Sequence, residues 1–217
     1  MNANKDYRTV TTFPFLVDVA LKKSDLEHEI RLKHKRAKVM YNFVHNKKEE
    51  YFQKFVNIYN SRCAYCGISI GLSDVRLFEI DHFVCEKSFS KDTLGRSEAG
   101  KVNNLVLACY ACNRGKRELL IDKDYQKTLN PDDGSIAQVF YRDEDYYIAI
   151  RSKFYGDIFV DKFYNRLLLH SEFRRLDYLL QEMEKFISEQ QISNPDVAGK
   201  MQQCLGLLIV KRNKTLI

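Results

Sequence analysis

The sequence contains no run of about 18 apolar residues, so it lacks a segment that could cross a membrane as a helix. Its first residues carry no apolar stretch of the kind found in secretory signals, and we therefore expect a cytoplasmic protein. Only 3 prolines are present, and no low-complexity tract or long internal repeat occurs, which argues against repeat architectures. Because disulfides are rare in the cytoplasm, the 6 cysteines require another explanation.

The composition is that of a folded protein. Apolar residues make up 45% and charged residues 29% of the 217 positions, and 14 Phe and 13 Tyr provide surface to bury. The length suits one good-sized domain, or one domain with helical additions. The 35 basic and 29 acidic residues give a net charge of +6, which suits a polyanionic partner without requiring one.

The pattern of apolar residues divides the chain into three regions, residues 1–60, 61–128 and 129–217. Apolar residues in the first region recur at steps of three and four, which predicts helical structure after a short tail. Residues 24–27 resemble a capping box, and residues 45–48 are the expected break. The pattern leaves open whether this region forms one helix or two.

The second region alternates between short apolar runs and polar segments. We expect strands at residues 75–80 and 104–108, separated by a polar loop at residues 84–102. A helix is expected over residues 112–127, with Gly115 and Asp122 as unfavourable residues within it.

The third region begins with a strong turn signal at residues 130–134. Residues 137–141 and 146–150 predict a β-hairpin. Two helices follow, and their apolar stripes are expected to be core; the stripes comprise Phe173, Leu176, Leu179, Leu180, Met183, Phe186 and Ile187, and then Val197, Met201, Cys204, Leu205, Leu208 and Ile209.

Four of the cysteines form two C-x-x-C pairs, Cys63 with Cys66 and Cys109 with Cys112. Two such pairs are the usual frame of a tetrahedral zinc site, with each pair supplying two ligands from a short turn. A redox-active pair is the alternative, but the βαβ setting of a thioredoxin-like protein is absent. The spacing therefore predicts a structural Zn²⁺ site.

The 42 residues between the pairs, and those just after them, carry a second set of polar residues. Asp81-His82 ends a predicted strand, Asn104 precedes the second pair, and Asn113 directly follows it. Each signal alone is weak. Each C-x-x-C pair with its turn is called a knuckle below. The order of these residues between and after the two knuckles resembles the zinc-bearing branch of the HNH endonuclease family, and the resemblance covers residues 63–116.

This resemblance implies an α+β fold with a ββα-metal core, flanked by helical regions. It implies that Asp81 and Asn113 bind a catalytic Mg²⁺ or Mn²⁺, and that His82 is the general base that takes a proton from water. The family also uses an Asn at the position of Asn104 to hold the loop and orient the base. The chain departs from the family at residues 83–85, where Ile and Pro are common, so the following loop is expected to take its own path.

Three more charged residues are candidates for the site. Arg114 and Lys116 are candidates for phosphate contacts or for support of the metal ligands, from their charge and position. Glu79 shares a strand face with Asp81 and is a candidate metal ligand or supporting group, although an ordinary loop carboxylate is an open alternative. The same alternation places Asp81 and His82 on opposite faces, so both can serve one centre only if the strand ends or bulges there.

The expected function is metal-dependent hydrolysis of phosphodiester bonds in DNA. A zinc-stabilised binding module without catalysis is the alternative. The basic segment at residues 31–38 is a candidate for contact with the DNA backbone, with a solvated helix face as the other interpretation. The layout of an HNH core with helical flanks also resembles the nuclease subunit of Septu-type anti-phage defence systems, which implies an ATPase partner.

Overall fold

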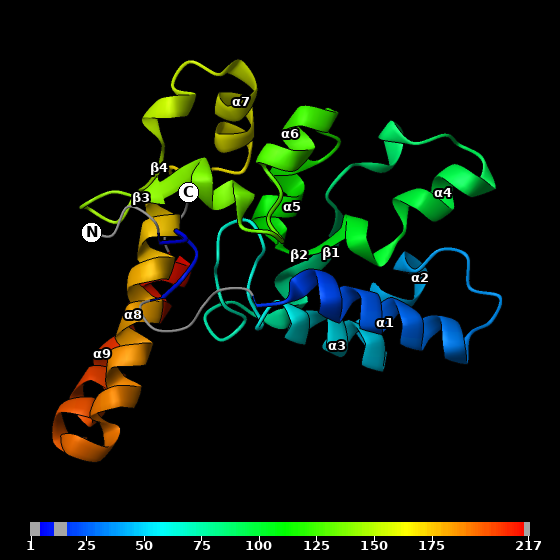
Figure 1. The fold of residues 1–217 in the computed structure, drawn as a ribbon. Coiled ribbons are helices and arrows are strands. Elements are labelled where there is room, and N and C mark those ends of the chain that lie inside the picture. The colour runs from blue at the N-terminus through cyan, green and yellow to red at the C-terminus, as the bar shows by residue number, and fades with distance from the viewer. Residues whose placement is uncertain (1–4, 11–16, 215–217) are drawn as a thin grey trace.

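The computed structural model describes residues 5–10 and 17–214. The outermost residues of the first and last predicted regions, together with residues 11–16, lie outside this described part. Within it the protein combines helices with two small antiparallel sheets, as the α+β prediction requires (Figure 1). None of the described helices is long and apolar enough to span a bilayer.

The first region forms more helices than the sequence pattern resolved. The expected break at residues 45–48 is present, and a second break lies before Tyr41. The predicted capping box at Ser24 is wrong, because the first helix already begins at Val19 and Ser24 therefore lies within it. The helices are α1 (Val19–Lys33), α2 (Tyr41–Val44) and α3 (Glu50–Ile58).

The central sheet pairs β1 (Phe78–His82) with β2 (Leu105–Cys109) in antiparallel register, with Phe78 opposite Cys109 and His82 opposite Leu105. The first strand starts later than predicted, because residues 75–77 form a 3-10 turn that Asp74 caps through its side chain. All five residues of β2 are buried. The sheet therefore carries the second knuckle at one end and the Asp-His pair at the other.

The connection between these strands is not a simple polar loop. It contains α4 (Thr93–Ala99), which begins where Asp92 accepts a hydrogen bond of 2.7 Å from the backbone N–H of Gly95. This acceptor at the N-cap satisfies one of the free donors of the first turn.

The helix predicted over residues 112–127 is divided into α5 (Tyr110–Lys116) and α6 (Lys123–Thr128). Arg117 breaks it, because its φ of 46° does not continue a right-handed helix. Gly115 lets another segment approach closely, since a Cβ there would lie 2.0 Å from the carbonyl oxygen of Arg166. This close approach fixes α5 against the end of α7 (Ile158–Arg166).

The third region contains the predicted hairpin, in which Phe140 pairs with Ile150, and the two predicted long helices. An additional helix that the pattern did not indicate lies between them. The elements are β3 (Phe140–Arg142), β4 (Ile148–Ile150), α7 (Ile158–Arg166), α8 (Glu172–Ser193) and α9 (Pro195–Lys214).

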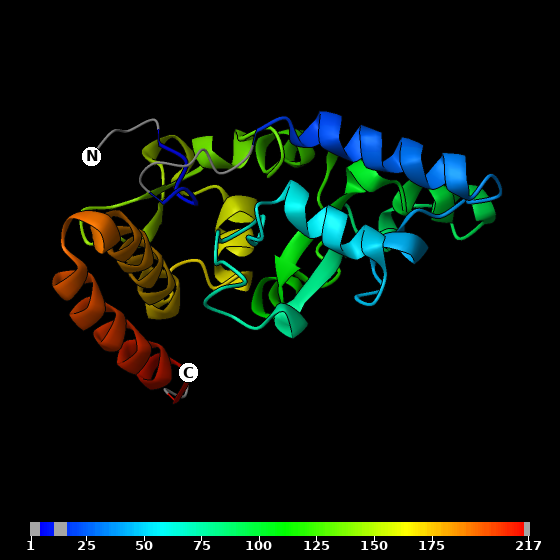
Figure 2. The ribbon, with the colours of Figure 1, turned by 90° about the horizontal axis from the view of Figure 1, so that it is seen from below.

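The apolar side chains form two cores. The large core joins the N-terminal helices, the central sheet, the hairpin and α7. The small core lies mostly between α8 and α9, which form a helical hairpin that extends from the rest of the molecule (Figures 1 and 2). The predicted stripes only partly enter this core, because Phe186, Val197 and Leu208 are exposed. Two packed helices offer too few neighbours to cover both stripes.

Candidate metal centre and active site

The four cysteines of the two pairs meet at one point. Cys63 and Cys66 lie in a tight turn, Cys109 ends β2, and Cys112 lies in the first turn of α5. All four are buried, and their sulfur atoms lie within 4.8 Å of one another. Four converging thiols with no disulfide are the donor set of a tetrahedral metal site, so the cluster fits a metal ion and suits zinc.

The first knuckle is held by its backbone. The N–H of Gly67 donates to the carbonyl of Cys63 at 2.9 Å, and Gly67 has a φ of 78°, which favours glycine. The N–H of Ala64 donates to the carbonyl of Leu107 on β2 at 2.7 Å. The knuckle is therefore attached to the strand that leads to the second pair.

Two arginines that the sequence did not single out also contact the knuckles. Arg8 is buried and donates to the carbonyls of Ala64 and Pro131. Arg174 of α8 lies against the sulfurs of the second knuckle. Both residues lie far from the knuckles in sequence and outside any recognisable motif, so no local pattern could have identified them.

Asp81 is buried against α5 and the first knuckle. Its carboxylate accepts a hydrogen bond of 2.7 Å from the hydroxyl of Tyr65 and lies 3.0 Å from the ammonium of Lys116. Lys116 is 0% exposed and also donates to the carbonyl of His82 at 2.7 Å. Burial raises the pKa of Asp81, while the charge of Lys116 and the hydroxyl of Tyr65 oppose that rise. Of the two roles predicted for Lys116, this position suits support of the carboxylate.

His82 is the last residue of β1 and contacts a different element. Its ring packs on the ring of Tyr41 of α2, with 4.6 Å between centroids. Its Nε2 atom is buried and has no hydrogen-bond partner among the described residues, and the nearest carboxylate oxygen, on Glu86, is 3.6 Å away. Burial lowers the pKa of His82 below its ordinary 6.5, so the imidazole is neutral near pH 7. A neutral imidazole with a free nitrogen is able to accept a proton.

Asn104 fastens the chain that leaves His82. Its side-chain amide donates to the carbonyls of Val84 and Ala99 at 2.9 and 2.8 Å, and its side-chain oxygen accepts from the N–H of Val84 at 2.9 Å. Its backbone carbonyl accepts from the N–H of Phe83 at 2.8 Å. These bonds fix the two residues after His82, where the sequence departs from the common HNH pattern.

Asn113 is placed beside Glu79, not in direct contact with Asp81. Its side-chain amide donates to a carboxylate oxygen of Glu79 at 2.5 Å. Arg114, whose side chain is 60% exposed, lies 3.6 Å from the same carboxylate. Glu79 and Asp81 are two residues apart on β1, so their side chains share one face of the sheet, the face on which α5 lies. This edge of the sheet therefore carries two carboxylates and one amide, an oxygen-rich set of the type that Mg²⁺ or Mn²⁺ prefers. Within it Asp81 is bound to Tyr65 and Lys116, and Glu79 is bound to Asn113.

The basic segment at residues 31–38 is partly neutralised. Arg31 pairs with Glu27 at 2.6 Å, and Lys33 pairs with both Glu29 and Glu50 at 2.9 Å. Lys35, Arg36 and Lys38 are exposed.

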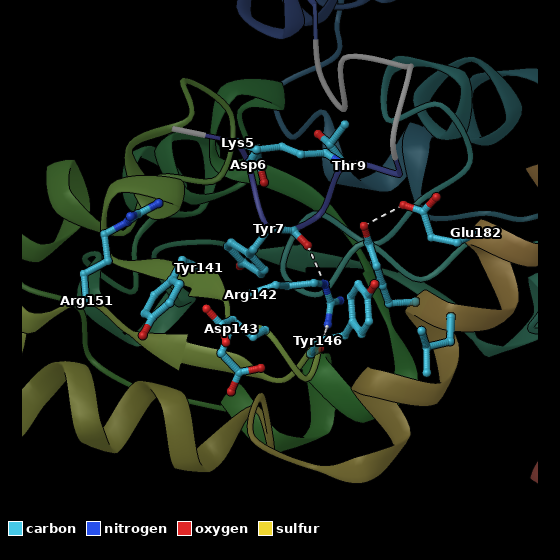
Figure 3. A pocket seen from close by; sticks show the side chains of 13 residues that line it. Lys5, Asp6, Tyr7, Thr9, Tyr141, Arg142, Asp143, Tyr146, Arg151 and Glu182 are labelled. Atoms are coloured by element: carbon cyan, nitrogen blue, oxygen red, sulfur yellow. Dashed lines mark hydrogen bonds between the residues drawn. The ribbon is translucent and has the colours of Figure 1, made fainter. Parts of the chain in front are cut away.

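A separate cavity of about 650 Å³ opens between the N-terminal segment, the β3–β4 hairpin and α8 (Figure 3). Arg142 lies across it, donating to the carbonyls of Tyr7 and Tyr146 and stacking on Tyr178 at 4.1 Å. None of the residues that line it belongs to the site predicted from the sequence. The Asp-His site itself is an edge of the sheet and not this cavity.

Comparisons with known proteins agree with this geometry. Residues 63–118 match the family model described as HNH endonuclease. The chain is 24% identical over 102 residues to "SPbeta prophage-derived putative HNH endonuclease YoqL" of Bacillus subtilis (strain 168). That alignment covers 47% of this chain and 43% of the relative, so the chain spans less than half of that protein's length. No solved structure gives a significant match.

The strand pair, the helix that follows it and the four-cysteine cluster all lie within the matched segment. Residues 63–118 are therefore an HNH endonuclease domain, and the remaining elements are helical and hairpin additions to it. The division of the whole chain into three regions stays a prediction.

Proposed function

We propose that the protein is a metal-dependent endonuclease that hydrolyses phosphodiester bonds in DNA. The observation that supports this best is the state of His82 in the HNH domain. Its Nε2 is buried, has no hydrogen-bond partner among the described residues, and belongs to an imidazole that burial keeps neutral. A structural histidine at this depth would normally be hydrogen-bonded, so the free nitrogen suits a proton acceptor for an attacking water.

The oxygen-rich edge supplies the second requirement of phosphodiester hydrolysis. Asp81 and Asn113 would hold Mg²⁺ or Mn²⁺, with Glu79 beside Asn113. A divalent cation there neutralises charge on the phosphate and stabilises the leaving oxygen. Lys116 and Tyr65 keep the Asp81 carboxylate oriented, and Asn104 fixes the backbone after His82. Arg114 is exposed beside this edge and is proposed to contact a phosphate.

The thiolate cluster has a structural role in this proposal. Zn²⁺ bound by Cys63, Cys66, Cys109 and Cys112 would join the first knuckle to the junction of β2 and α5. Asn113 directly follows Cys112, so the same metal would fix the position of an active-site residue.

The test is cleavage of supercoiled plasmid with Mg²⁺ or Mn²⁺ and with EDTA, comparing the wild type with His82→Ala. General-base catalysis contributes roughly 100- to 10,000-fold, so the variant should lose at least 100-fold of a metal-dependent activity. His28→Ala is the matched control, because His28 is an exposed histidine on α1.

Cleavage that persists in EDTA, or equally in both histidine variants, would contradict the proposal. A wild type that binds DNA but does not cleave it with either metal would favour the alternative, a zinc-stabilised binding module.

Three expectations from the sequence do not follow from the geometry of the proposed site. A role in anti-phage defence, an ATPase partner and a cytoplasmic location remain predictions. Comparing phage plating on cells with the wild-type gene and with His82→Ala tests the first of them, and only a difference between the two supports it.

A further inference from the structure

A buried arginine from the C-terminal hairpin lies against the four-cysteine cluster. Arg174 is the third residue of α8 and is 6% exposed. Its Nη2 atom is 3.2 Å from the sulfur of Cys112, and its Nη1 is 3.7 Å from the sulfur of Cys109. Nη2 also donates to the carbonyl of Leu167 at 3.3 Å. One planar guanidinium thus reaches both sulfurs of the second knuckle.

This contact joins segments that are far apart in the sequence. Arg174 lies 62 residues after Cys112 and outside the HNH domain at residues 63–118. A guanidinium is always charged, and burying one is unfavourable unless anionic partners accept its hydrogen bonds. Its Nε has no partner within the described residues, so the sulfurs and one carbonyl are what hold the group. The cost of burying Arg174 is therefore explained if the sulfurs are thiolates.

The net charge of a metal-bound cluster also favours a buried cation beside the sulfurs. Four thiolates around one divalent cation leave two negative charges that have no counter-ion within the cage. In a buried site such an excess is unfavourable, and N–H groups directed at the sulfurs reduce it. Groups that hydrogen-bond to metal ligands also orient them and tune the metal.

A second ion pair lies close by on α8. Asp177 lies one turn after Arg174 and is 3% exposed, and its carboxylate accepts from Arg212 of α9 at 2.6 and 3.0 Å. Negative and positive groups therefore alternate from the cluster through Arg174 and Asp177 to Arg212. The Asp177–Arg212 pair joins α9 to α8, the helix that carries Arg174.

We propose that Arg174 is a positioning residue of the metal–thiolate cage, which it holds closed by donating hydrogen bonds to Cys109 and Cys112 and by offsetting their charge. The helical hairpin is then part of the metal site. Losing the guanidinium should leave the fold in place but make the cage lose zinc more easily and make its sulfurs more nucleophilic.

The test uses the full-length, zinc-loaded protein and Arg174→Met, which keeps an unbranched side chain without charge. Arg175→Met is the matched control, because Arg175 follows on the same helix and pairs with Glu172 instead of the cluster. Zinc release to a chelating dye is followed with and without N-ethylmaleimide, and circular dichroism monitors the fold. We expect Arg174→Met to bind zinc about 10–100-fold more weakly than the control and to be alkylated faster.

A second variant covers the case in which Arg174→Met does not fold. Arg174→Lys keeps the charge but cannot contact both sulfurs at once, and its Co²⁺-loaded form should show a shifted thiolate-to-metal charge-transfer band. Arg174 variants that match Arg175→Met in zinc release, alkylation and this band would overturn the proposal, as would a wild type that binds no metal at the cluster. These measurements do not depend on nuclease activity, so a failure of the nuclease proposal would leave them readable.

Discussion

At the residue scale, the proposed active site is built from side chains that are each held by a different element. Asp81 is held by Tyr65 and Lys116, and His82 packs on Tyr41. The alternation of β1 directs these neighbouring side chains to opposite faces, and the strand ends at His82. The sequence proposed Asp81 and His82 as site residues but did not indicate Tyr41 or Tyr65, because an aromatic side chain carries no spacing signal of its own.

Asn104 gives a direct prediction at this scale. Asn104→Ala removes three hydrogen bonds and leaves backbone groups of Val84 and Ala99 without their partner. Leaving buried polar groups unpaired costs about 1–3 kcal/mol each, so the free energy of unfolding should fall by at least that amount. Urea denaturation measures the change. Asn103→Ala is the control because Asn103 is exposed, and equal stability of the two variants would contradict the assigned role of Asn104.

At the element scale, the sequence identified the long elements better than their ends. The strands, the hairpin and the two C-terminal helices were predicted, because apolar periodicity is strong there. The division between α5 and α6 lies between Gly115 and Asp122, the two residues that disfavour one continuous helix in the sequence, and Asp122 caps α6. The exact break was not predicted, since it depends on the backbone of Arg117 and on the packing of Arg166 against Gly115. Such contacts are set by tertiary structure and leave no periodic signal in the sequence.

The N-cap of α7 gives a prediction that depends on pH. Asp157 accepts hydrogen bonds of 3.0 Å from the N–H groups of Phe159 and Val160 and also contacts the hydroxyl of Tyr125. Burial works to raise the pKa of Asp157, but these donors outweigh it and hold the pKa below 3.8. The stabilisation is therefore complete above pH 3.8 and is lost as the pH falls through the lower folded-state pKa.

Asp157→Ala should thus lower the free energy of unfolding by about 1 kcal/mol at neutral pH, which is typical for loss of an N-cap. The difference from wild type should shrink at acidic pH, where the carboxylate is protonated. Denaturant unfolding at several pH values measures this, and a difference that grows on acidification would contradict the assignment.

At the scale of the whole molecule, the HNH domain is not an independent core. Its sheet shares one apolar core with the N-terminal helices, the hairpin and α7, and its knuckles contact Arg8 and Arg174 from the two flanks. The sequence located the domain because its ligand spacing is local. It could not locate these flank contacts, because they depend on how distant segments fold together.

The thiolate cluster gives a prediction for the whole molecule. Cys109→Ser should abolish stoichiometric zinc binding and lower the free energy of unfolding by several kcal/mol, because metal binding and folding are coupled. Metal analysis and circular dichroism measure both effects. Cys204→Ser is the matched control, since Cys204 is exposed on α9, and equal zinc content in the two variants would rule out the cluster as the metal site.

The most direct test of the central claim is chemical rescue of the proposed base. His82→Gly removes the imidazole beside Tyr41 and leaves a space of its shape. We predict that this variant fails to cleave plasmid with Mg²⁺ or Mn²⁺, and that added imidazole restores cleavage with a dependence on its unprotonated form. A variant that cleaves as fast as wild type without imidazole would show that His82 is not the base and would contradict the account.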